Sequence, residues 1–132
     1  LLVFFFYLMA KIATHKDLRV FQAAFKAAME IYKLSKSFPA EEKFSLTDQI
    51  RRSSRSVCAN MAEAYRKRRY PKNFVSKLSD CEAEAAETQV WLDFAIACDY
   101  ITIEDYEKFY KEYDMILGML VKMIVEPEKW KV

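Results

Sequence analysis

The sequence contains very little glycine, proline, cysteine and histidine, and these shortages exclude several kinds of structure and site. One glycine and three prolines among 132 residues are too few turn formers for a protein of many short strands. A single glycine also cannot build a glycine-rich loop that cradles phosphate. Because alanine, lysine, glutamate, leucine and methionine are common, we expect long helices, short loops and no β-sheet.

The histidine and the cysteines are too few and too scattered for the usual metal or nucleophile sites. A metal-carboxylate bundle needs Glu-x-x-His pairs, but His15 has no acidic residue three positions away and precedes the first predicted helix. It is also a poor base for a serine or cysteine nucleophile. Cys58, Cys81 and Cys98 are far apart within helical patterns, which is typical of unpaired thiols in a reducing compartment. We therefore expect a cytoplasmic non-enzyme without metal, cofactor, disulfide or small-molecule substrate.

The N-terminal run LLVFFFYLMA is apolar but only about half as long as a bilayer-spanning helix. It has no preceding charge and no small-residue cleavage site, so we expect neither a signal peptide nor a membrane span. We expect Met9 to be the natural start. The alternative is an extension that docks on a groove or on a neighbouring subunit. The predicted organisation is an apolar extension at 1–14, a helical bundle at 15–126 and a tail at 127–132.

Apolar residues recur every three or four positions in four segments, as in helices with one buried face. The first predicted helix extends from a cap at Asp17 to about residue 36, before Ser37-Phe38-Pro39. The second begins at Leu46, after a capping box formed by Ser45 and Asp48, and extends to about residue 69. The aromatic side chains of the intervening loop, Phe38 and Phe44, are expected to pack under the end of the bundle.

Residues 70–73 interrupt the pattern before a third helix at 74–98, and Thr102 caps a fourth helix that Pro127 closes. Gly118 within the fourth helix is expected to permit close helix approach. Four such helices with short loops predict an all-α, up-down-up-down antiparallel four-helix bundle. The predicted inner faces are Leu18, Phe21, Phe25, Ala28, Tyr32 and Ser35; Leu46, Ile50, Ser54, Val57, Met61 and Tyr65; Phe74, Leu78, Cys81, Ala85, Thr88, Leu92 and Ala95; and Tyr106, Phe109, Tyr113, Ile116, Leu120 and Ile124.

Charge is distributed unevenly along the chain. Residues 51–77 contain nine lysines and arginines but one acid, Glu63, so this stretch carries +8 while the whole chain carries +2. The third helix is acidic, and its Glu84 and Glu87 are typical of a solvated or interfacial face rather than a catalytic pair. On the second helix, Arg52, Arg55, Ala59 and Arg66 are predicted to lie opposite the apolar face.

The basic stretch is the candidate binding site, because guanidinium groups pair with phosphate and its interleaved Tyr65 and Tyr70 can stack on unpaired bases. Two alternatives remain open. The basic face could pair with the acidic third helix of another subunit, or it could simply be solvated. The candidate nucleic-acid-binding residues are Arg51, Arg52, Arg55, Arg66, Lys67, Arg68, Arg69 and Lys72.

Residues 49–64, QIRRSSRSVCANMAEA, resemble the QIRRAAVSIPANIAEG segment of the 23S rRNA intervening-sequence protein family. The resemblance extends over about residues 15–125. Cys58 and Ala64 replace the family's usual proline and glycine, and both changes favour a regular helix. The residues that carry the motif are Gln49, Arg51, Arg52, Asn60 and Glu63.

The resemblance implies a bacterial four-helix bundle without catalytic activity that forms homo-oligomers, commonly ring-shaped pentamers. Some members are encoded within insertions in 23S rRNA genes, and the fold is similar to the accessory variability protein that partners a reverse transcriptase in diversity-generating retroelements. The implied role is therefore binding to RNA or to a nucleoprotein. The rival is a protein-interaction scaffold without nucleic acid. Asn60 and Glu63 are expected to form a hydrogen-bonded interhelical pair or to contact a partner.

Overall fold

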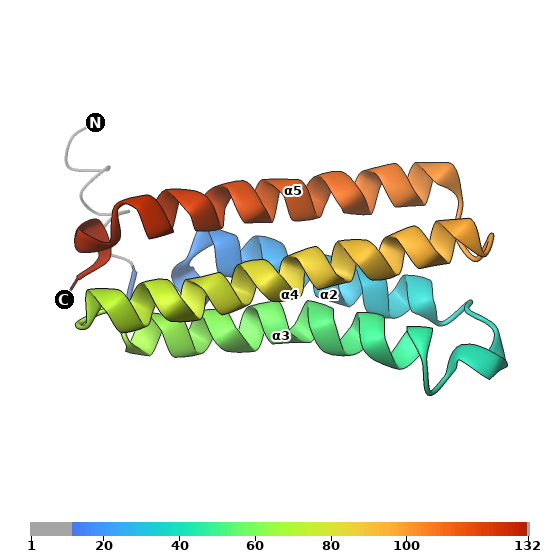
Figure 1. The fold of residues 1–132 in the computed structure, drawn as a ribbon, viewed down its shortest axis with the longest axis horizontal. Helices are drawn as coiled ribbons and strands as arrows, with labels where there is room; N and C mark the ends of the chain where they lie inside the picture. Colours follow the sequence, from blue (N-terminus) through green and yellow to red (C-terminus); the bar gives the residue numbers. More distant parts are fainter. Residues whose placement is uncertain (1–11, 132) are drawn as a thin grey trace.

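The computed structural model describes residues 12–131, and four long α-helices make up most of this part of the chain (Figure 1). Each long helix runs antiparallel to the one before it, and no strand occurs between residues 12 and 131. The predicted antiparallel four-helix bundle is confirmed. The elements are η1 (His15–Asp17), α2 (Arg19–Ser35), η2 (Ala40–Glu42), α3 (Leu46–Arg66), α4 (Pro71–Ala97), α5 (Ile103–Val125) and η3 (Pro127–Trp130), where η denotes a 3-10 helix.

The core follows the predicted apolar faces of α3 and α4 closely. All six predicted positions of α3 and all seven of α4 are buried. In α5, four of the six are buried, while Tyr106 and Ile124 are half-buried. Hydrophobic burial along these faces is the dominant stabilising contribution in such a bundle.

The buried face of α2 matches the prediction only in part: Leu18, Ala28 and Ser35 are buried as predicted. Phe25 is 53% exposed, and Phe21 and Tyr32 are only half-buried. Two stripes with three- and four-residue spacing run along this helix, and the prediction chose the one with larger side chains. The small side chains of the other stripe permit close helix packing. The residues that are buried are Val20, Ala24, Ala27, Ala28, Ile31 and Ser35.

Two of the three predicted helix caps are wrong. Thr102 Oγ1 accepts a hydrogen bond from the Asp105 amide at 3.1 Å, as expected. Asp17, however, does not cap α2, because its carboxylate accepts from the amides of Ala13 and Thr14 before η1. Ser45 makes no side-chain cap either, since its hydroxyl donates to Glu42, whose carboxylate also accepts from the Leu46 amide at 3.3 Å.

The turn between α3 and α4 lies about three residues earlier than predicted, at 67–70 instead of 70–73. Helix α3 ends at Arg66 rather than near residue 69, and Pro71 is already part of α4. Proline is favourable at the first position of a helix, because its missing N–H would have no partner there. The Tyr70 amide donates to the Lys67 carbonyl at 2.9 Å, which closes the turn. Several of the candidate cations therefore lie on a tight turn rather than on a helix.

Three further expectations have mixed outcomes. Phe38 is buried with its ring centroid 5.7 Å from that of Tyr100, but Phe44 is 87% exposed, so only one loop aromatic packs under the bundle. Gly118 faces open space and does not permit close helix approach. Trp130, in the predicted tail, packs partly against the core.

Residues 1–11 of the predicted N-terminal extension lie outside the part of the chain that the structure describes. Among residues 12–131, no helix combines the length and apolarity needed to span a membrane.

Candidate nucleic-acid interface

The eight candidate cations form two separate groups along α3. Arg51, Arg52 and Arg55 lie in its first half, and we call them the arginine group. The remaining five, which we call the turn group, lie around the α3–α4 turn: Arg66, Lys67, Arg68, Arg69 and Lys72. At a rise of 1.5 Å per residue, Arg55 and Arg66 are about 16 Å apart along the helix axis. Arg52, Arg55, Ala59 and Arg66 are all exposed, which confirms the predicted outer face.

The arginine group is held partly by contacts to α2. The Arg51 guanidinium carbon is 4.7 Å from the centroid of the Tyr32 ring, and that of Arg55 is 5.6 Å from it. Arg51 Nε also donates to Ser35 Oγ at 2.7 Å. Cation–π contacts and this hydrogen bond restrict the rotamers of both arginines. Tyr32, predicted to be a core residue, instead supports the basic surface.

Arg52 is the member of the arginine group that contacts the acidic helix. Its Nη2 is 3.7 Å from Glu87 Oε1, and both side chains are substantially exposed. An exposed ion pair of this kind contributes at most about 1 kcal/mol. Beside it, burial and the neighbouring Glu87 raise the pKa of Glu84 above its ordinary value. Part of the acidic face is thus matched by a cation of the same chain.

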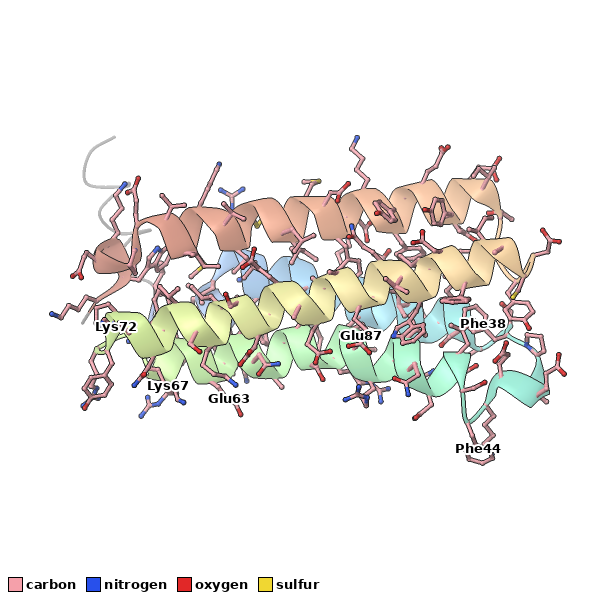
Figure 2. All side chains as sticks on the ribbon, viewed as in Figure 1. Phe38, Phe44, Glu63, Lys67, Lys72 and Glu87 are labelled. Atoms are coloured by element: carbon pink, nitrogen blue, oxygen red, sulfur yellow. The ribbon has the colours of Figure 1, made fainter. Side chains whose placement is uncertain are left out.

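The turn group is exposed except for Arg68. The Arg68 guanidinium lies over the Tyr65 ring at 3.6 Å, and its Nε donates to the Tyr65 carbonyl at 2.9 Å, so this arginine caps the end of α3. The other four cations make no ion pair within residues 12–131: Arg66, Lys67, Arg69 and Lys72. Figure 2 shows Lys67 and Lys72 at the same end of the bundle. Tyr70, between them in sequence, is 57% exposed.

Asn60 and Glu63 join α3 to α4 through Lys77. Lys77 Nζ lies 2.8 Å from Asn60 Oδ1, 2.6 Å from Glu63 Oε2 and 3.4 Å from Asp80 Oδ2. The hydrogen bond to Glu63, opposed by partial desolvation, raises the pKa of Lys77. Asn60 and Glu63 do not bond to each other, but both contact this ammonium group of α4, which agrees with the expected interhelical hydrogen bonding. Lys77 was missed, although its position three residues before Asp80 is typical of an ion pair on one helix face.

Two of the three thiols are at least half-buried, and the histidine packs against an aromatic ring. Burial raises the pKa of the Cys58 thiol to about 11 and that of Cys81 to about 12, so both are protonated and unreactive near neutral pH. The His15 ring lies edge-on to Phe21 at 4.8 Å. In the described part of the chain, no three His, Cys, Asp or Glu residues are grouped as metal ligands.

Comparison with known proteins identifies the family of this chain and supports its helical fold. The family model of the 23S rRNA-intervening sequence protein matches residues 16–122. Among solved structures, the chain is similar to a protein of unknown function from the S23 ribosomal protein family of Bacteroides thetaiotaomicron VPI-5482. The two share 34% sequence identity with a TM-score of 0.72, and the match covers 80% of this chain and 94% of that one. No match was found among curated proteins. On its sequence and its fold, this chain belongs to the 23S rRNA-intervening sequence protein family.

Proposed function

We propose that this protein is a cytoplasmic, non-enzymatic homo-oligomer that binds RNA or a nucleoprotein through its basic surface. The observation that carries the proposal is the exposure of Arg66, Lys67, Arg69 and Lys72 at one turn without an ion-pair partner among residues 12–131. Like charges so close together repel one another, and a polyanion relieves that repulsion. The family resemblance adds the expectation of a ring of five subunits.

Phosphate is the anion that fits this surface best. Arginine binds phosphate oxygens in a bidentate manner, whereas lysine contributes a compact point charge. Because Tyr70 projects from the same turn, an unpaired base can stack beside the phosphate contacts. Contacts to phosphate carry no sequence information, so we propose binding with little sequence preference.

The test is the salt dependence of binding to a fluorescein-labelled single-stranded RNA of twelve nucleotides, measured by fluorescence anisotropy. If the four unpaired cations each contact a phosphate, log affinity should fall with log salt at a slope of about −2.8. A variant with all four replaced by alanine should lose most of this slope and bind weakly at low salt. The matched control replaces four exposed lysines elsewhere, Lys33, Lys111, Lys122 and Lys131, and changes the net charge equally.

Equal losses in the two variants would show a response to net charge and would contradict a specific interface. Absence of RNA binding by the unaltered protein at low salt would overturn the proposal.

The second candidate function is a protein-interaction scaffold in which the basic and acidic faces meet between subunits. The Arg52–Glu87 pair, formed within one chain, favours it because it shows that cations of α3 and carboxylates of α4 pair when they are brought together. Native mass spectrometry of the same variants distinguishes the two. A scaffold loses subunits when the turn group is neutralised, whereas an RNA-binding oligomer keeps its mass and loses only the RNA.

A further inference from the structure

Phe44 is the most exposed large apolar side chain described, with 87% of its surface accessible. It lies in the turn between η2 and α3, and Figure 2 shows its ring directed away from the bundle, at the end opposite the turn group. Phe38, in the same loop, is buried. The loop therefore has room for one ring in the core and leaves the other in water. A single exposed ring is common on protein surfaces, so its role depends on what surrounds it.

The surroundings of Phe44 are cationic. Phe44 borders an open hollow of about 540 Å³ on the first half of α3. Four cationic side chains, Lys43, Arg51, Arg52 and Arg55, line the hollow together with a single acid, Asp48. Lys43 Nζ is 5.3 Å from the centroid of the Phe44 ring. Aromatic surface and positive charge thus converge on one concavity.

The hollow is also preorganised. Because Arg51 and Arg55 rest on Tyr32, and Arg51 is bonded to Ser35, their guanidinium groups are positioned before any ligand arrives. Ligand binding then costs less side-chain entropy. Arg52 is held only by a 3.7 Å contact to Glu87, which a phosphate can replace.

We infer that this hollow binds an unpaired nucleotide of single-stranded RNA, with the base stacked on Phe44 and the adjoining phosphates held by Arg52 and Arg55. The inference rests on the proposed function and adds a second site to the turn group. The positive charge of the hollow indicates which ligand occupies it. The apolar face of a second copy would cover Phe44 but would bury several cations without partners, which is strongly unfavourable. A phosphodiester strand satisfies both the ring and the cations.

The position of the hollow also suits a strand that reaches the turn group. The two sites lie at opposite ends of α3, which has 21 residues and is therefore about 31 Å long. Ser56 and Ala59, which have small side chains, line the hollow on the side nearer to the turn group.

The experiment compares Phe44→Leu, which keeps apolar bulk but removes the ring, with Phe44→Trp, which retains a stacking surface. The probes are the labelled twelve-nucleotide single strand and a labelled, blunt-ended RNA duplex, which has no unpaired base. Phe44→Leu should weaken single-strand binding about 5- to 100-fold, and Phe44→Trp should restore it. Duplex binding should change less than 2-fold. Phe25→Leu, at another exposed phenylalanine, is the matched control and should leave both affinities unchanged.

Each other outcome has a definite meaning. If Phe44→Leu binds the single strand as tightly as the unaltered protein, while the turn-group variant loses binding, the Phe44 site is refuted and the proposed function stands. If no RNA binds at low salt, the proposed function fails and this inference fails with it. If Phe44→Leu instead lowers the oligomer mass in native mass spectrometry, the hollow is a subunit contact and the inference is overturned.

Discussion

The buried hydrogen bond between Ser53 and Thr88 predicts an asymmetric response to mutation that tests how α3 and α4 are joined. Both residues are fully buried, and their hydroxyl oxygens are 2.8 Å apart. Thr88 also donates to the Glu84 carbonyl at 2.9 Å, so its proton is used there and Ser53 must donate to Thr88. Within residues 12–131, the only other acceptor for Ser53 is the Ile50 carbonyl, at 3.4 Å.

The two single substitutions should therefore differ in cost. Thr88→Val leaves the buried Ser53 hydroxyl with only the long bond to Ile50, and a poorly satisfied buried group of this kind costs about 1 to 3 kcal/mol. Ser53→Ala removes one accepted bond from Thr88 and leaves its donated bond intact. The gain in helix propensity, about 0.5 kcal/mol, offsets part of that loss. We expect about 2 kcal/mol for Thr88→Val and less than about 1 kcal/mol for Ser53→Ala.

The double variant tests the assigned direction of the Ser53–Thr88 hydrogen bond. With both hydroxyls removed, no buried donor is left without a partner, so Ser53→Ala should rescue Thr88→Val by about 1 kcal/mol or more. Urea unfolding followed by circular dichroism, at one fixed protein concentration, measures all four free energies of unfolding. Additive costs in the double variant, or a Thr88→Val cost no larger than that of Ser53→Ala, would refute the assigned direction of the hydrogen bond.

Two further predictions concern thiols and pH. Brief treatment of the native protein with iodoacetamide near neutral pH should modify only the exposed Cys98, because Cys58 and Cys81 are protonated and at least half-buried. Peptide mass spectrometry measures the modification of each cysteine. Rapid modification of Cys81 would contradict the packed core. Hydrogen bonds to Glu42, first from Ser45 and then from Tyr100, hold its pKa below the usual 4.5, so its contribution to stability is present above that pH and lost as pH falls through the lowered value. Glu42→Gln should therefore lower Tm by more at about pH 6 than at about pH 3, and an equal loss of Tm at both would contradict the role of the charge.

The long helices and their inner faces were predictable where one stripe of residues dominates. In α4, seven positions at three- and four-residue spacing were predicted to be buried and all are. In α2 the same spacing selected Phe25, which is exposed, rather than Ala24, which is buried. Both residues belong to stripes of equal regularity. Periodicity indicates that a helix has a buried face. Which face is buried depends on how closely the neighbouring helices pack against it.

The candidate site was predictable in composition but not in arrangement. The eight cations were identified from the charge of residues 51–77, yet the sequence could not show which of them are held by other side chains. Contacts with other side chains hold four of these cations in position. Arg51 and Arg55 rest on Tyr32, Arg52 meets Glu87, and Arg68 folds back over Tyr65. None of these partners is implied by charge alone.

The sequence by itself determined the number and kind of elements, the family and the basic stretch, because these depend on local spacing and composition. The tertiary structure alone decided which cations remain without partners and which loop aromatic stays in water. Phe38 and Phe44 are the same residue type in one loop, and the bundle end accommodates only the first. Burial is a competition for limited space, and its outcome depends on all four helices together.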